Sequence, residues 1–248
     1  MELLSWEQLK ANLQDDMDLE DENFISDAGL VRYVNRALDD AETCIHTLHH
    51  EDKYFLVPAV FALESGMSQY SLPGDIYANK IRLMFYSNGS LKYPIPRIKN
   101  LTQIPYITSA DRYQYIIYNS TPTNSPQEAP VFSNGGVYVQ FYPDVAETSE
   151  NVSLWYIRNM KKMTTDEDDT SNICEIPECV NFVYQHVRLS MAKKVRVQSL
   201  IDQERIDLKI QYDLMCDALK EMVPDEDNKI PPDLSSYWDQ NLIWQGGF

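Results

Sequence analysis

Three histidines near position 50 are the first residues whose types and spacing could hold a metal ion. His46, His49 and His50 form an H-x-x-H-H pattern, and two histidines three or four residues apart on a helix can share a zinc ion. The only further ligands nearby are Glu51 and Asp52. A solvent-exposed helix C-terminus, where histidine interacts favourably with the helix dipole, explains the pattern more simply. We therefore predict no metal here.

The cysteines and the acidic loop are weaker metal candidates still. Cys174 and Cys179 lie five residues apart, unlike the CxxC knuckle of tetrahedral zinc sites. Residues 166–177 begin like a calcium-binding loop, but Ser171 and Pro177 stand where that loop requires Gly and Glu. We predict structural thiols, a solvent-exposed acidic loop and no cofactor, with weak adventitious calcium binding as the open alternative.

The common catalytic motifs are absent from the sequence. It contains no G-x-S-x-G elbow, P-loop, G-x-G-x-x-G or H-E-x-x-H. Adjacent carboxylates such as Asp39 and Asp40 lie in acidic stretches that water and mutual repulsion explain. An acid–base pair assembled from distant positions stays open, but we predict no catalytic residue and no enzyme.

The composition and the net charge limit the classes of protein to which this chain can belong. The chain has 248 residues, of which 44% are hydrophobic and 11% aromatic, enough for one large or two small folded domains. Its formal charge of −17 argues against a protein that grips phosphates, because Lys and Arg supply most of that affinity. The same acidity suits a channel through which DNA slides, or simply keeps soluble proteins apart.

The cysteine usage and the termini indicate an intracellular setting without a membrane. Four irregularly spaced cysteines, among them Cys44 and Cys216, suggest reduced thiols rather than a disulfide framework. The N-terminal residues lack the basic and apolar regions of a signal peptide. No window approaches eighteen apolar residues, so we expect no membrane span.

The longest predicted element covers residues 176–222. This run has no Gly, and its only Pro, Pro177, stands at the first helical position. It predicts one long helix, or two helices with a hinge. A continuous helix would span roughly 70 Å, too long for burial in one globule. The alternatives are an assembly element that packs against neighbouring copies, and the packed helix of an ordinary helical domain.

Apolar residues recur at helical spacing in both halves of this run, while its middle, from Gln198 to Arg205, is polar. We expect this middle to be solvated, kinked or placed against another subunit. We predict contacts between subunits at seven apolar positions: Val187, Met191, Val195, Ile201, Leu208, Met215 and Leu219.

The rest of the chain predicts two helices and then a sheet. Apolar spacing indicates helices at 3–13 and, capped by Ser26 or Asp27, up to about residue 45. Aromatic and β-branched residues between turn signals indicate strands, and Pro94 and Pro96 push the strand that contains them to an edge. The predicted strands are 54–63, 69–72, 80–86, 92–98, 113–118, 136–141 and 153–160.

The predicted architecture is α+β, a helical bundle with a long C-terminal helix and an inserted antiparallel β module. Residues 1–50 and 173–223 form the bundle, residues 51–165 the β module and residues 224–248 an extended C-terminal arm. The arm either folds back on its own domain or docks in a partner's groove. Its predicted docking residues are Trp238, Leu242, Ile243, Trp244 and Phe248.

The order of several short motifs carries a resemblance to a known family. The motifs are DxxLVxYVNRALxDA at 27–41, YSLPGD at 70–75, IRL at 81–83, a basic-aromatic strand ending at Arg97 and Ile98, residues 113–118, FYP at 141–143, LWYIR at 154–158 and IPE at 176–178. In this order, over about residues 24–195, the chain resembles the head-to-tail adaptor (connector) proteins of tailed bacteriophages. These include the tail tubular ring proteins of short-tailed phages and the ring proteins of crAss-like phages.

The resemblance implies a structural, non-enzymatic virion component. Such a subunit forms a ring, usually a dodecamer, beneath the portal protein in the neck of the virion, and is assembled in the cytoplasm of the bacterial host. Its helical bundle carries the contacts between subunits, and its β module faces outward or the next tail or ring component. DNA passes through the lumen without specific binding. The long aromatic tail of this chain departs from the family pattern, so the partner of the arm stays open.

A monomeric binding module is the alternative from another functional class. Its β module would hold a glycan or peptide on the aromatic residues Tyr106, Tyr113, Tyr115, Tyr118, Tyr138 and Trp155. Tyrosines at alternate strand positions more often pack across strands than form a ligand platform. We therefore prefer the adaptor hypothesis.

Overall fold

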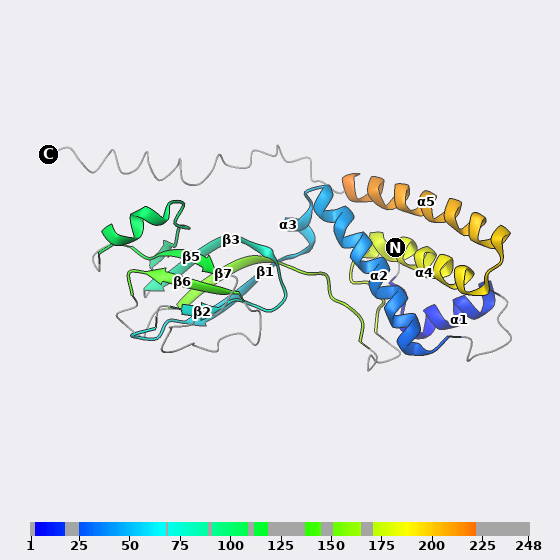
Figure 1. The fold of residues 1–248 in the computed structure, drawn as a ribbon, viewed down its shortest axis with the longest axis horizontal. Coiled ribbons are helices and arrows are strands. Elements are labelled where there is room, and N and C mark those ends of the chain that lie inside the picture. Colours follow the sequence, from blue (N-terminus) through cyan, green and yellow to red (C-terminus); the bar gives the residue numbers. More distant parts are fainter. Residues whose placement is uncertain are drawn as a thin grey trace.

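The computed structural model describes residues 3–17, 25–67, 69–88, 91–108, 112–118, 137–144, 151–164 and 171–221. The molecule is elongated, with helices gathered at one end and strands at the other (Figure 1). The α+β class predicted from the sequence is confirmed, as are the antiparallel sheets.

Two capped helices begin the fold. Helix α1 (Trp6–Asp16) starts at a capping box, in which Ser5 Oγ accepts from Gln8 N and the Gln8 side chain accepts from Ser5 N. Helix α2 (Asp27–Thr47) is capped by Ser26, whose side chain accepts from Gly29 N at 3.3 Å. Both helices fall where the apolar spacing predicts them, and Ser26 is the cap.

The C-terminal run forms a helical hairpin. A short 3-10 turn, η2 (Pro177–Cys179), leads into α4 (Val180–Val195), and α5 (Gln198–Glu221) packs back along α4. Arg196 ends α4 in the left-handed conformation, with φ of 64°, and so reverses the chain. The single continuous helix is therefore wrong, and the hinged pair is correct. The two apolar halves cover each other, so the chain needs no second copy to bury them.

One hydrophobic core holds the helices together. The apolar stripe of α2 packs on α4, as predicted, and α1 and α5 complete the cluster. The core draws on every described helix of this end, with Leu9, Leu13, Val34, Leu38, Ile45, Val183, Val187, Met191, Met215 and Leu219 among its members. Burial of side chains of this size supplies about 1.5–3 kcal/mol each, which makes this cluster the main stabilising feature of the helical end.

In the described part of the chain, seven strands form two antiparallel sheets at the other end. The four-stranded sheet has the order β1-β7-β3-β4, and the three-stranded sheet has the order β2-β6-β5. Every predicted strand has its counterpart, and the proline-containing strand β4 lies at an edge as expected. The bounds are β1 Leu56–Ala62, β2 Gln69–Ser71, β3 Ile76–Asn88, β4 Leu91–Pro94, β5 Gln114–Tyr118, β6 Tyr138–Tyr142 and β7 Asn151–Arg158, with a 3-10 helix, η1, at Leu101–Tyr106.

The sheets share a second core. Alternate residues of β7, namely Val152, Leu154 and Tyr156, are buried, as the two-residue period of a half-buried strand requires. Phe141 of the smaller sheet packs at 5.5 Å, ring centre to ring centre, from the fully buried Tyr70. None of the buried residues of this core belongs to the helical core, so each end of the molecule has its own.

Two segments join the ends. A short helix, α3 (Glu51–Tyr54), leads into β1, and its buried Glu51 accepts from Lys80 Nζ at 2.9 Å and from Arg82 Nη2 at 3.0 Å. The chain leaving β7 returns along α2. There Met160 N donates to the buried Glu42 Oε1 at 2.8 Å, and Asn35 exchanges two hydrogen bonds of 2.9 Å with the backbone of Met163.

Candidate assembly interface

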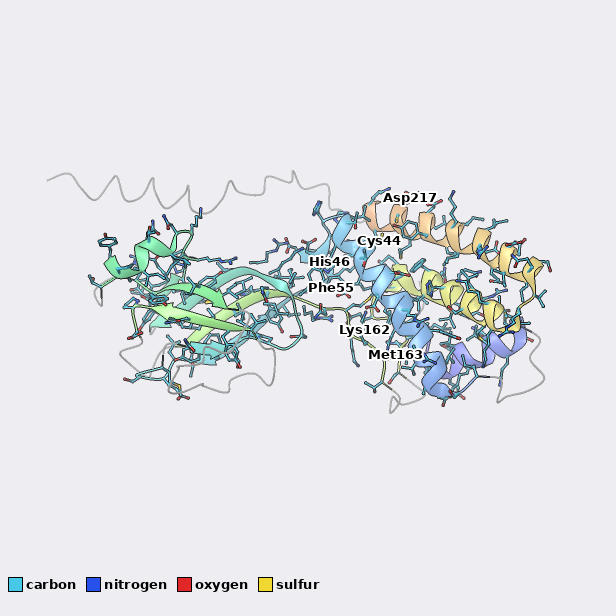
Figure 2. All side chains as sticks on the ribbon, in the orientation of Figure 1. Cys44, His46, Phe55, Lys162, Met163 and Asp217 are labelled. Carbon is cyan, nitrogen blue, oxygen red and sulfur yellow. The ribbon has the colours of Figure 1, made fainter. Side chains whose placement is uncertain are left out.

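His46 lies in a buried position at the junction of the two ends. Its ring stacks on Tyr77 with centres 3.6 Å apart and lies 5.5 Å from Phe55, and Figure 2 shows His46 and Phe55 together there. Burial lowers the pKa of His46, and nearby Lys80 lowers it further. The expected solvent-exposed helix end is therefore wrong for this histidine. Three-dimensional packing, which the H-x-x-H-H spacing cannot show, places it inside.

The described residues contain no group of three His, Cys, Asp or Glu side chains arranged to hold a metal ion. Part of the acidic run that begins like a calcium loop, residues 165–170, lies outside the described chain. All four cysteines are free thiols.

A buried charged network links α1, α4 and α5. Glu204, only 1% exposed, accepts from Arg188 Nη2 at 2.9 Å and from the Gln185 side chain. Arg188 also donates to Asp16 Oδ2 at 3.2 Å. Of the three possibilities expected for the middle segment (solvated, kinked or against another subunit), solvation holds for the exposed Gln198, Asp202 and Arg205 but not for Glu204, which is buried within its own chain. The hairpin turn lies before Glu204, so this carboxylate faces α4 and is held there by Arg188.

The seven positions predicted to form subunit contacts divide into two groups. Val187, Met191, Met215 and Leu219 are at most 2% exposed because α2, α4 and α5 cover them within one chain. Val195 is 37% exposed, whereas Ile201 and Leu208 are half-buried. The structure brings the first group together as core, and contact of any of the seven with another subunit stays a prediction. The predicted docking residues Trp238, Leu242, Ile243, Trp244 and Phe248 lie outside the described residues.

The outward face of α5 carries an apolar stripe that sequence reasoning missed. Ile206, Ile210 and Leu214 are 58%, 50% and 56% exposed, and their spacing of four residues places them along one side of the helix. The exposed Asp213, between Ile210 and Leu214, and the exposed Asp217, one turn beyond Leu214, lie on the same side. We call these three apolar residues the α5 stripe. In the sequence, Ile206, Ile210 and Leu214 repeat every four residues on a different side of the helix from Leu208 and Met215. This second apolar repeat could have revealed the stripe.

A basic groove lies between α2 and the end of α4. It encloses about 650 Å³ and is lined by Tyr33, Arg36, Asp39, Asp40, His186, Ser190, Lys193, Lys194 and Arg196. Four of these side chains are Lys or Arg and two are Asp, so the groove is locally positive in a chain of net charge −17. His186 Nε2 lies 3.2 Å from Asp40 Oδ2, and burial lowers the pKa of His186 although Asp40 opposes the shift. We call this feature the α2–α4 groove.

The outer face of the four-stranded sheet is also apolar. Trp155 of β7 pairs across strands with Pro58 of β1 and with Leu83 of β3, so the three side chains lie on the same face. Trp155 is 36% and Leu83 39% exposed, and Val60 beside them is 61% exposed. We call Pro58, Val60, Leu83 and Trp155 the outer sheet face. An exposed cluster of this kind is typical of an interaction surface.

The aromatic residues proposed as a ligand platform do not form one surface. Tyr115 is buried at 6% exposure, whereas Tyr106 is 81% exposed on η1 and Trp155 lies on the outer sheet face. Tyr113 packs edge-on against Tyr86. Tyr138 is partly buried and is paired in register with Tyr118 of β5. The strand tyrosines therefore serve mainly as packing residues.

Comparison with known proteins assigns the family. None of the described helices combines the length and apolar character needed to cross a membrane. No curated protein matches the sequence. A family model described as SU10 adaptor protein matches residues 5–228, nearly the whole chain, and this confirms the resemblance to phage head-to-tail adaptors. The chain therefore belongs to the SU10 adaptor protein family.

Proposed function

We propose that this chain is a non-enzymatic subunit of an oligomeric ring that joins portal and tail in a phage virion. The observation that carries the proposal is the family match over residues 5–228, which gives the chain a structural adaptor role in a phage particle. The ring, a dodecamer by its resemblance to related adaptors, lies in the neck of the virion and is assembled in the host cytoplasm.

The contacts within such a ring need two different surfaces on each subunit. A closed ring of identical chains joined head to tail pairs one patch with a second, complementary patch of the next copy. The α5 stripe is apolar, and beside it lie the exposed Asp213 and Asp217, the latter 3.4 Å from Lys220 Nζ. The α2–α4 groove is basic and has the exposed Val195 and Val197 at its end. We propose that the α5 stripe of one copy contacts the α2–α4 groove of its neighbour. The acidic residues beside the stripe and the basic residues of the groove attract each other and so favour this contact.

The acidic surplus supports a role around DNA. A net charge of −17 repels the phosphate backbone, so DNA can pass a lumen lined by such chains without adhering. Affinity for DNA would require clustered Lys and Arg facing the lumen. In this proposal the clustered basic residues of the α2–α4 groove are covered by the neighbouring copy.

The two ends of the molecule face different partners in this proposal. Residues 1–50 and 173–223 form the ring-building domain, and residues 51–165 form a β module whose outer sheet face contacts the next tail or ring component. Trp155 and Leu83 supply the apolar centre of that contact. The arm at 224–248 docks on a partner, for which the portal protein is our first choice.

Solution mass of the full chain, alone and mixed with portal protein, tests the proposal. We expect a ring-sized assembly in at least the mixture, since some ring subunits assemble only on their partner. Electron micrographs of that assembly should show a central opening. A chain that stays monomeric in both samples would overturn the proposal.

The second candidate is a monomeric module that binds a glycan or peptide. The exposed Trp155 on the outer sheet face favours it, because an exposed aromatic side chain with neighbouring apolar residues suits a sugar ring or an extended peptide. Binding to a glycan or peptide array by a chain that remains monomeric with portal protein would support this candidate. Loss of that binding in Trp155→Ala would place the ligand on the outer sheet face.

A further inference from the structure

Two cysteines from distant parts of the sequence meet inside the helical end. Cys44 lies on α2 and Cys216 lies on α5, and their sulfur atoms are 3.1 Å apart. Figure 2 shows Cys44 beside Asp217, the residue that follows Cys216. A disulfide bond is about 2.05 Å long, so the two sulfur atoms need to approach by about 1 Å.

The two thiols differ in accessibility. Cys44 is 4% exposed, whereas Cys216 is half-buried and reachable from solvent. The Tyr212 hydroxyl, one turn before Cys216, lies close to both sulfur atoms. Burial raises the pKa of Cys44 to about 12, helped by the neighbouring Cys216, so this thiol stays protonated at neutral pH. An oxidant therefore meets Cys216 first, and Cys44 acts as the resolving partner.

We propose that Cys44 and Cys216 form a disulfide cross-link between α2 and α5 when the folded chain meets a hydroperoxide. Cys216 sulfur attacks the peroxide, the O–O bond breaks, and a sulfenic acid and an alcohol or water form. Cys44 sulfur then attacks the Cys216 sulfur, the S–O bond breaks, and water leaves with the Cys44 proton. The two thiols lose two electrons and two protons, and the peroxide is reduced by two electrons.

The cross-link would hold α5 to a helix that it otherwise touches little. Helix α5 packs mainly on α4, and Cys216 lies near its C-terminal end. The bond would close a loop from residue 44 to residue 216, and long loops restrict the unfolded chain most. Thiols stay reduced in a cytoplasm and oxidise outside it, so a chain that leaves the cell would gain the cross-link afterwards.

The test treats the reduced full chain with hydrogen peroxide at neutral pH. The product is then denatured, its free thiols are alkylated, and its mass and peptides are determined. We expect the loss of two hydrogen atoms, two alkylated cysteines instead of four, and one peptide pair that joins Cys44 to Cys216. We also expect the melting temperature to rise by several degrees and to return on addition of a dithiol reductant.

Matched variants separate this pair from the other two cysteines. Cys174 and Cys179 are both buried and contact each other, so Cys174→Ala with Cys179→Ala serves as the control and should keep the cross-link. Cys216→Ala, at the more accessible position, should abolish the cross-link and the rise in melting temperature. Four alkylated cysteines after peroxide, oxygen added to Cys216 without a cross-link, or a disulfide that persists in Cys216→Ala would each overturn the proposal.

Discussion

At the scale of single residues, His46 couples the packing between the two ends to pH. The groups that face it are the rings of Phe55 and Tyr77 and the charges of Glu42, Glu51, Lys80 and Arg82. Neither ring nitrogen has a hydrogen-bond partner among the described residues. Because burial lowers its pKa, folded His46 stays neutral in a range where the unfolded chain, with a histidine pKa of about 6.5, binds a proton.

The sign of the pH dependence follows from that difference. Below about pH 6.5 the unfolded state gains a proton that the folded state does not, so His46 makes the folded chain less stable as pH falls. We expect urea unfolding to show a smaller loss of stability between pH 7 and pH 5 in His46→Phe than in the parent chain, since Phe keeps a ring against Tyr77 without titrating. His49→Asn, at an exposed position, should keep the parent slope. Equal slopes in His46→Phe and the parent would contradict this assignment.

Glu204 gives a second prediction at this scale, on stability. Replacing Glu204 by Ala leaves the Arg188 and Gln185 side chains without their buried acceptor. Removing one partner of a buried ion pair costs about 3–5 kcal/mol, and the retained contact of Arg188 with Asp16 reduces the expected loss to about 2–3 kcal/mol. Denaturant titration measures it.

Asp202→Ala is the matched control for Glu204→Ala. Asp202 lies on the same helix and contacts Arg205 at 3.4 Å, but its side chain is 57% exposed. An exposed pair contributes about 0–1 kcal/mol, so the control should stay close to the parent. Similar losses in the two variants would show that Glu204 has no special structural role.

At the scale of elements, α5 has two faces with different tasks. The side that carries Met215 and Leu219 completes the helical core, whereas the α5 stripe is available to a neighbouring copy. We expect Ile210→Asp with Leu214→Asp to abolish ring assembly with portal protein while the melting temperature of the monomer changes little. Both side chains are at least half exposed, so their replacement removes little buried area. Analytical ultracentrifugation and thermal unfolding measure the two effects.

Leu101→Asp controls for the change in hydrophobicity and charge. Leu101 is 65% exposed on η1, at the β end of the molecule, away from the helices. We expect this variant to assemble as the parent chain does. If the double variant on α5 still assembles, or if Leu101→Asp fails to assemble to the same extent, the α5 stripe is not part of the interface.

At the scale of the whole molecule, truncation of the C-terminal arm tests whether folding and assembly depend on different parts of the chain. Because we propose that the arm docks on a partner rather than on its own chain, a chain that ends at Pro231 should fold with the circular dichroism spectrum and melting temperature of the parent. Because the removed segment contains Trp238 and Trp244, large aromatic side chains that often anchor interfaces, we expect weaker binding to portal protein. Unchanged binding, or a truncated chain that fails to fold, would argue against a docking arm.

The sequence by itself determined the elements and the class of fold, because these depend on local patterns. The cap at Ser26, the turn signals between strands and Pro94 of β4 act within a few residues of themselves. The order of short motifs also identified the adaptor family, which the match over residues 5–228 bears out.

Only the tertiary structure decided which residues face each other across long separations. The reversal at Arg196 turns the apolar halves of one run into a self-covering hairpin. It thereby buries Met215, brings Cys216 to Cys44, and leaves the α5 stripe outside. Helical spacing shows that two faces of a helix are apolar but not which one its own chain will cover. That choice depends on the summed burial of α1, α2, α4 and α5, and is therefore made only when they pack.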